Sequence, residues 1–208
     1  SVSLLPDSAD EVRCGSERLS ARPVIVGFGP AGMFASLTLA ALGYAPLVIE
    51  RGGSVGERVA AVEHFYRTGE LDTGTNIQFG AGGAGTFSDG KLTTRIGDPR
   101  CRGVLKMLHS LGAPEDILTS AKPHIGTDIL RRVVENAAER LTELGGEIRY
   151  HTALTELPMR SGEVGRIMTD GGEIECGAVV LAVGHSARDT YSMIMRRGYE
   201  VVPKAFSM

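Results

Sequence analysis

The hydrophobic pattern near the amino end predicts a strand, a helix and a second strand. Residues 24–26 are apolar at every position, which is typical of a strand buried on both faces of a parallel sheet. Apolar residues then recur at helical spacing through residues 30–42, and Gly43 is expected to end this helix. Residues 47–49 form the next apolar strand. The pattern therefore indicates a βαβ unit, whose crossover is expected to be right-handed.

The middle of the chain predicts three further helices and one long irregular segment. Helical spacing of apolar residues extends over residues 55–67, 102–111 and 127–144. The last helix is the clearest, because its apolar residues form one stripe, Thr127 is a suitable N-cap and Gly145 follows its end. Residues 68–98 are rich in glycine and have no periodicity. A segment of this length is more often a functional loop than a spacer.

Short strands dominate the carboxyl-terminal third of the chain. They are expected at residues 147–150, 154–157, 166–169 and 173–175. Between them lie Ser161-Gly162 and Asp170-Gly171-Gly172, which are typical of hairpin turns. This part of the chain therefore predicts a small antiparallel β hairpin element.

The last elements return to the pattern of a buried parallel strand. Residues 178–183 are wholly apolar and end at Gly184, and a helix is expected from Ser186 to Arg197. Ser186 and Asp189 resemble a capping box at the start of this helix. Together, the elements predict an α/β fold with three layers around a central parallel sheet.

Composition narrows the class of protein. The chain has 208 residues, of which 42% are hydrophobic and 23% charged, as in an ordinary globular domain. The formal charge of −3, with both signs scattered along the chain, argues against a nucleic-acid-binding surface, which needs a basic face. Glycine is in excess, with 28 residues, so the backbone is expected to turn sharply or approach another group closely at many places.

Cysteine usage and one apolar run bear on the compartment. Cys14, Cys101 and Cys176 form no CxxC pair, which excludes a thioredoxin-type redox disulfide and a four-cysteine zinc site and favours a reducing, cytoplasmic location. Residues 23–49 carry no charge, but their glycines and Pro30 would break a membrane helix near its start. No membrane span is predicted.

A glycine fingerprint occupies the turn between the first strand and the first helix. Gly27, Gly29 and Gly32 have the spacing GxGxxG, and Glu50 ends the second strand, 21 residues after Gly29. In this context the spacing indicates a dinucleotide-binding site. Gly27 would form the tight turn, Gly29 would admit a pyrophosphate, and Gly32 would let helix and strand pack closely. The helix amino terminus, where the missing N–H of Pro30 costs no hydrogen bond, would then face the phosphates.

Glu50 bears on which dinucleotide fits. Its carboxylate is expected to accept hydrogen bonds from the adenosine ribose hydroxyls and would repel a 2′-phosphate, so NADP is disfavoured in this site. The fingerprint does not separate FAD from NAD, because both use it. A simple NAD-dependent dehydrogenase would continue with βα units directly after Glu50. This chain continues instead into the glycine-rich loop, which favours FAD.

Four segments resemble a family of FAD-dependent dehydrogenases among the two-dinucleotide-binding-domain flavoproteins. They are VIVGFGPAG at 24–32, VIERG at 48–52, FGAGGAGTFSDGKL at 79–92 and LAVGHSARD at 181–189. The first two are shared by very many flavoproteins, and the last two are far more specific. The resemblance extends over most of the chain from Arg22 onward. It implies a Rossmann-like FAD-binding domain of an oxidoreductase that transfers hydride through the flavin.

The resemblance also implies where FAD is held. The pyrophosphate would lie over the start of the first helix, the adenosine ribose at Glu50, and the glycine-rich loop beside the pyrophosphate and flavin. A chain without Cβ atoms suits the last role, although a flexible surface linker is the alternative. The expected cofactor-binding residues are Gly27, Gly29, Pro30, Ala31, Gly32, Glu50, Arg51, Gly52, Gly82, Gly83, Gly85, Thr86, Ser88, Lys91 and Gly184.

Few side chains suggest chemistry of their own. Lys91 is the candidate catalytic residue, as a cation that would stabilise negative charge on the reduced flavin. A phosphate contact and a solvated lysine are the alternatives. Ser88 and Asp89 would either hydrogen-bond ribityl or phosphate oxygens or only cap the local turn. His185 is expected to have no catalytic task, and the histidines show no metal-ligand spacing, so no metal site is predicted.

The domain and function assignments follow from these patterns. Residues 1–21 are expected to be an N-terminal tail or the remnant of a preceding domain. Residues 22–208 are expected to be the FAD/NAD(P)-binding domain, incomplete at its carboxyl end, where residues 199–208 read as a strand leading onward. The substrate and electron donor stay open, with NAD(P)H a candidate donor. A nucleotide-binding module without redox activity and an NAD-linked dehydrogenase remain alternatives.

Overall fold

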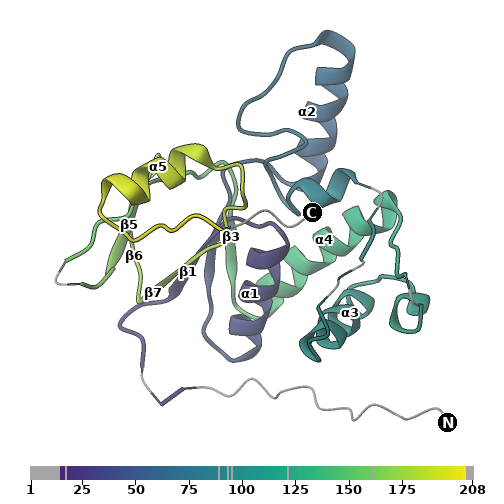
Figure 1. Cartoon of the computed structure of the whole chain (residues 1–208), viewed down its shortest axis with the longest axis horizontal. Coiled ribbons are helices and arrows are strands. Elements are labelled where there is room, and N and C mark those ends of the chain that lie inside the picture. The colour runs from purple at the N-terminus through teal and green to yellow at the C-terminus, as the bar shows by residue number, and fades with distance from the viewer. Residues whose placement is uncertain are drawn as a thin grey trace.

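A parallel sheet of four strands forms the centre of the molecule, in the order β3-β2-β1-β7 (Figure 1). The computed structural model describes residues 15–204 apart from 17, 89, 93, 95, 121 and 161. The strands of this sheet are β1 (Pro23–Val26), β2 (Leu47–Ile49), β3 (Glu147–Arg149) and β7 (Ala178–Leu181). All three pairings are parallel, and Val24 on β1 lies beside Leu47 on β2 and Val179 on β7.

Two helices cover one face of this sheet. They are α1 (Pro30–Ala41) and α4 (Thr127–Glu143), which lie next to each other. Successive strand residues point to opposite faces, so Ile25 and Val48 face the helices and pack with the stripe of α4 that contains Val133. Burying one such side chain contributes about 1.5–3 kcal/mol. The α4 stripe predicted from the sequence is therefore the main cover of this face.

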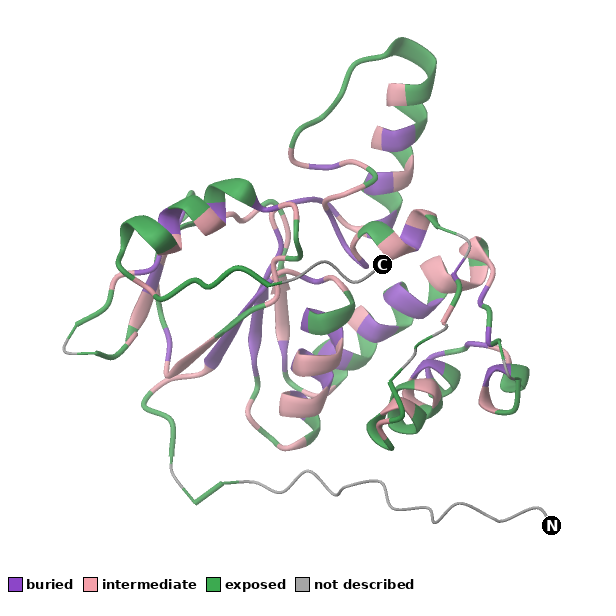
Figure 2. Ribbon diagram, viewed as in Figure 1, coloured by how far each residue is buried: buried purple, intermediate pink, exposed green. Residues whose placement is uncertain are grey.

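The opposite face of the parallel sheet carries a small antiparallel sheet and one helix. The antiparallel strands β4 (Leu154–Glu156), β5 (Arg166–Thr169) and β6 (Gly172–Glu175) lie in the order β4-β5-β6, and the helix is α5 (Arg188–Arg196). Val24 and Ile49 point to this side and share a second core with Ile167 and Met193. Buried residues concentrate along the central strands and the sides of the helices that face them (Figure 2). The result is a Rossmann-like α/β fold in three layers, as the sequence predicts.

The remaining elements lie between β2 and α4 along the chain. Helix α2 (Val55–Thr68) projects from the body of the molecule (Figure 1). The glycine-rich segment that follows is irregular in its described part apart from the short helical turn η1 (Ala84–Phe87), and Lys91 forms an isolated bridge with His124. The next elements are α3 (Arg100–Ser110) and the turn η2 (Glu115–Leu118). The long loop predicted from composition is therefore confirmed.

Two predicted helix caps are wrong. The N-cap of α4 is Gly126, and the Thr127 hydroxyl instead donates a hydrogen bond to the Ser88 carbonyl oxygen at 3.0 Å. Helix α5 begins after Ala187 without a side-chain cap, so Ser186 and Asp189 form no capping box there. The Thr127 side chain thus bonds a residue distant in sequence instead of capping its own helix. The start of α5 has no side-chain cap at all.

Two strand predictions also need correction. The strand at 147–149 belongs to the parallel sheet, where it pairs with β2, and not to the hairpin region that follows it. Residues 199–204 form no strand, and residues 205–208 lie outside the described part of the chain, as do Ser161 and Asp89. The hairpin predicted at Asp170-Gly171-Gly172 is confirmed, because it joins β5 to β6.

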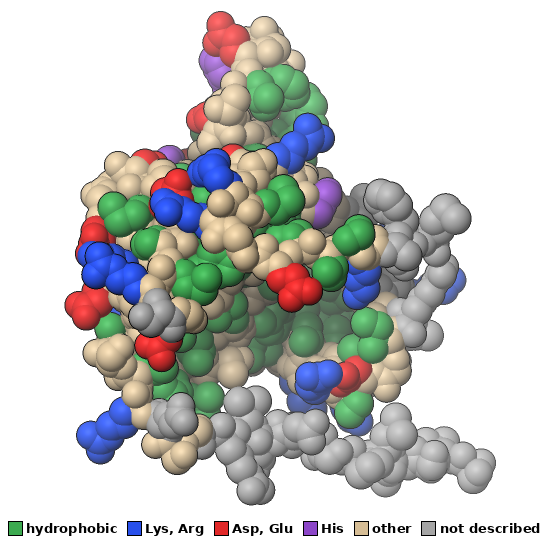
Figure 3. Space-filling view, turned by 60° about the vertical axis from the view of Figure 1, so that its left-hand side comes forward, with side chains coloured by type: hydrophobic (Ala, Val, Ile, Leu, Met, Phe, Trp, Pro, Cys, Tyr) green, Lys and Arg blue, Asp and Glu red, His purple; other side chains and the backbone are tan. Residues whose placement is uncertain are grey.

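Of the helices within the described ranges, none has the length and apolar character needed to cross a membrane. Basic and acidic side chains are interspersed over the face shown in Figure 3.

Candidate functional site

A cavity of about 420 Å³ opens at the carboxyl ends of β1, β2 and β7. The last residues of these strands, Val26, Ile49 and Leu181, line it together with the segments that follow them. The chain runs from β1 outward to β2 and β3 on one side, and β7 joins β1 on the other side. The cavity therefore lies at the point where strand order reverses, which is where open α/β sheets bind ligands.

The glycine turn after β1 forms one wall of the cavity. Gly27 has a φ of +101°, its N–H donates to the Ile49 carbonyl oxygen at 2.7 Å, and a Cβ here would lie 2.6 Å from the Ala182 oxygen. A Cβ on Gly32 would overlap the carbonyl oxygen of Gly27. These two glycines thus make the tight turn and the close helix packing that the fingerprint predicts.

Gly29 differs from its two neighbours because its open side faces the cavity. The nearest atom to a Cβ built on Gly29 is the Gly83 Cα, at 3.8 Å. Gly29 is the N-cap of α1, Pro30 is its first residue, and both line the cavity with Ala31. The first N–H groups of a helix have no partner within it and carry partial positive charge. This wall therefore suits an anionic group.

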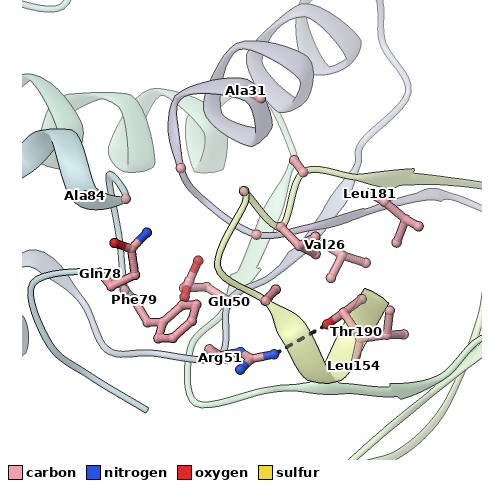
Figure 4. Close-up of a pocket in the computed structure, with 18 of the residues that line it drawn as sticks. Val26, Ala31, Glu50, Arg51, Gln78, Phe79, Ala84, Leu154, Leu181 and Thr190 are labelled. Atoms are coloured by element: carbon pink, nitrogen blue, oxygen red, sulfur yellow. Dashed lines mark hydrogen bonds between the residues drawn. The ribbon is translucent and has the colours of Figure 1, made fainter. Parts of the chain in front are cut away.

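Glu50 forms the floor of the cavity between the ends of the strands (Figure 4). Its side chain is only 5% exposed. One carboxylate oxygen accepts from the Phe28 N–H at 2.8 Å and the other from the Gly52 N–H at 2.9 Å. Glu50 therefore ties the fingerprint turn to the segment after β2. The two oxygens of a carboxylate accept about four hydrogen bonds, so acceptor capacity remains for a ligand.

Arg51 links three segments at one side of the cavity (Figure 4). Its guanidinium donates to Asp189 at 2.8 Å and to Thr190 at 3.5 Å, and lies 4.8 Å from the centroid of the Phe79 ring. Partial burial of Asp189 opposes ionisation, but the hydrogen bonds from Arg51 and from backbone N–H groups, together with the charge of Arg51, outweigh it, so the pKa of Asp189 lies below its usual value. Helix α5 is thereby held against the end of β2.

The glycine-rich loop forms the remaining wall. Gln78, Phe79, Gly83 and Ala84 are among its residues that line the cavity (Figure 4). The loop is anchored to the fingerprint region, because the Gly82 N–H donates to the Phe28 oxygen at 2.7 Å. The loop is therefore packed into the fold, and the surface-linker alternative does not apply to this stretch.

Nine of the predicted site residues line the cavity. They are Gly27, Gly29, Pro30, Ala31, Glu50, Arg51, Gly83, Gly85 and Gly184. The sequence patterns thus converge on one place in the fold, although their contact with a cofactor remains a prediction.

Six of the predicted site residues do not line the cavity. They are Gly32, Gly52, Gly82, Thr86, Ser88 and Lys91. The three glycines are required by packing, since a Cβ on Gly52 would lie 2.7 Å from the Gly74 oxygen and one on Gly82 would overlap Thr86. The Ser88 hydroxyl donates to the Gly85 oxygen at 2.8 Å, which is the turn-capping alternative.

Several lining residues have no counterpart in the sequence prediction. Gln78, Thr152, Thr190 and His185 line the cavity, as does Phe79. Phe79 opens the specific motif at 79–92 and could have been found there. His185 lies within the motif at 181–189 and could have been found in the same way. Gln78, Thr152 and Thr190 lie outside the four motifs, and only the folded chain brings them together. Within the described ranges, no group of three or more His, Cys, Asp or Glu side chains is arranged to hold a metal ion.

One known protein has a similar sequence over nearly the whole chain. No protein-family model matches the sequence. An uncharacterized protein from Clostridium beijerinckii is 49% identical over 199 residues, which are 96% of this chain and 37% of the relative. The chain thus spans little more than a third of that relative's length.

Solved structures are similar at lower identity. THI4 from Thermovibrio ammonificans has a TM-score of 0.55 and 16% identity, with 86% of this chain and 64% of that chain covered. L-proline dehydrogenase from P. horikoshii has a TM-score of 0.46 and 16% identity, with 83% of this chain and 55% of that chain covered. The likeness to THI4 shows that the chain has the α/β fold described above.

Proposed function

We propose that the chain is the FAD-binding domain of a flavin-dependent oxidoreductase. The observation that carries this proposal is one cavity at the switch point of the sheet, lined by both the open backbone of Gly29 and the carboxylate of Glu50. The motif at 79–92, which resembles the FAD-dependent dehydrogenase family, supplies a third wall of the same cavity.

The residues present fit an adenine dinucleotide. The start of α1 and the Gly29 backbone would bind the diphosphate, because they present N–H groups and no side chain stands in front of them. Glu50 would accept hydrogen bonds from ribose hydroxyls while keeping its bonds to Phe28 and Gly52. A 2′-phosphate would be repelled by this buried carboxylate.

FAD, when bound, supplies the hydride chemistry, and the protein positions it. In this proposal Arg51 and Phe79 line the ribose side of the cavity, and the hydrogen bond from Arg51 to α5 restricts solvent access there. Lys91 lies outside the cavity lining, so its proposed catalytic role rests only on its charge and on its place in the glycine-rich motif at 79–92.

The direct test is to purify the chain and identify its bound small molecule. We expect yellow protein that releases FAD on denaturation, identified by mass spectrometry, and saturable FAD binding after its removal. Gly29→Val would fill the open side of the cradle and abolish binding, whereas Gly103→Val on α3, where no atom lies within 4 Å of a Cβ, is the control.

Binding of NADH without FAD would indicate the NAD-linked alternative. Bound FAD that no reductant reduces would indicate a module without redox activity.

A further inference from the structure

Arg58 on α2 is the largest fully buried side chain in the described part of the chain, at 0% exposure. Its Nε and Nη2 both donate to the Asn76 carbonyl oxygen, at 3.1 and 3.0 Å. Nη2 also donates to the Ile77 oxygen at 2.9 Å. Nη1 donates to the oxygens of Ala81 and of Gly83, the latter at 2.9 Å. All five N–H bonds of the guanidinium are therefore used on one loop.

A glycine and an aromatic ring surround the buried Arg58 side chain. A Cβ on Gly80 would overlap the Cδ atom of Arg58, so only glycine at this position leaves room for the side chain. The guanidinium lies 4.7 Å from the centroid of the Phe87 ring, and Arg131 lies 4.8 Å from the same ring. Burial lowers the pKa of Arg58 to about 10, which Glu50 opposes and Arg131 reinforces. Arg58 is therefore cationic at neutral pH.

The partners of Arg58 determine how the loop presents its backbone. The C=O and N–H of a trans peptide point in opposite directions, so a carbonyl held toward Arg58 turns the next N–H away from it. The Ala81–Gly82 peptide shows this, because its oxygen accepts from Arg58 and its N–H donates to Phe28. The Gly83 oxygen is held in the same way, and Ala84, which follows it, lines the cavity (Figure 4).

We propose that Arg58 is a positioning residue for dinucleotide binding: its guanidinium fork holds loop residues 76–85 in the conformation that closes the cavity, without itself lining it. This inference rests on the proposed function. Besides the hydrogen bond from Gly82 to Phe28, the loop meets the fingerprint turn at Gly83, where a Cβ would lie 3.2 Å from the Gly29 Cα and the Pro30 Cδ. A shift of the loop at Gly83 would therefore change the shape of the phosphate cradle directly.

The test compares two substitutions of Arg58 with one control. Arg58→Lys keeps a positive charge but cannot span four carbonyl oxygens, and Arg58→Met keeps neither property. The control is Arg67→Met, an exposed arginine on the same helix. Hydrogen exchange of the ligand-free chain and affinities for FAD and for ADP are measured on the folded protein.

We expect residues 76–85 to exchange at least about tenfold faster in both Arg58 variants, while α1 exchanges as in the unaltered chain. FAD and ADP should bind at least about tenfold more weakly to both, and the Arg67 variant should match the unaltered chain.

Other results would overturn the proposal. A positioning role is contradicted if the loop exchanges at an unchanged rate or if the lysine variant keeps its affinity. It is also contradicted if neither Arg58 variant folds. If the unaltered chain binds neither FAD nor ADP, the proposed function itself is contradicted and the dinucleotide role of Arg58 is lost with it. If the unaltered chain binds and the lysine variant binds equally well, the Arg58 proposal alone is contradicted.

Discussion

Glu50 is buried although it carries a carboxylate, and its two backbone partners explain why this is tolerated. In Glu50→Gln, one of these N–H groups would face the amide NH2, which is a donor and not an acceptor. We expect the free energy of unfolding to fall by about 1–3 kcal/mol and FAD affinity to weaken. Urea unfolding and FAD titration measure both effects, with Glu63→Gln on the exposed side of α2 as the control. Unchanged values for Glu50→Gln would contradict both tasks assigned to this carboxylate.

Two glycines of the cavity wall should respond differently to alanine. Gly27 has positive φ and would place a Cβ 2.6 Å from the Ala182 oxygen, so Gly27→Ala should cost more than about 1 kcal/mol of stability. Gly85 lines the same cavity, but a Cβ there meets no atom within 4 Å. Gly85→Ala should therefore change stability by less than about 0.5 kcal/mol. Chemical denaturation distinguishes them, and equal stabilities would show that the turn relaxes around a side chain.

Helices were more predictable than their ends. Apolar stripes locate α1 and α4 because burial requires that spacing, whatever the rest of the fold does. A cap depends on what else the polar side chain can reach. Thr127 reaches Ser88, 39 positions away, and Asp189 reaches Arg51, 138 positions away, and neither partner is visible from local sequence.

The capping box that does form, between Ser54 and Glu57 at the start of α2, makes stability depend on pH. The backbone N–H of Ser54, followed by the side chain of His151, holds the pKa of Glu57 at about 2, below the usual 4.5. Because the folded-state pKa is depressed, this stabilisation is complete above pH 4.5 and is lost as pH falls toward 2.

Glu57→Gln tests this dependence. Glu57 and its partner His151 are both exposed, so the substitution should lower the free energy of unfolding by only about 0.5 kcal/mol at neutral pH. The difference in unfolding free energy from the unaltered chain should shrink to zero across the same pH interval. Urea denaturation over this pH range measures it. A difference that stays constant would mean that the charge of Glu57 contributes nothing.

At the scale of the whole molecule, the sequence predicted the layers better than the strand partners. Residues 147–149 read as one more strand before two hairpins, whereas α4 before them makes a crossover that returns the chain parallel to β2. The cavity shows the same limit. Its glycines and Glu50 have a motif, but Thr152 and Thr190 reach it only because the antiparallel layer and α5 pack against the strand ends.

Because residues from all three layers line the cavity, its ligand should stabilise the molecule as one unit. A ligand that binds only the folded chain raises the unfolding free energy by about 2.7 kcal/mol at a concentration 100 times its Kd. We therefore expect FAD to move a single urea transition to higher denaturant as its concentration rises. NADP should move it far less, since the buried Glu50 carboxylate opposes a 2′-phosphate. An equal shift with NADP would contradict the placement of the ribose at Glu50, and no shift with FAD would contradict the proposed function.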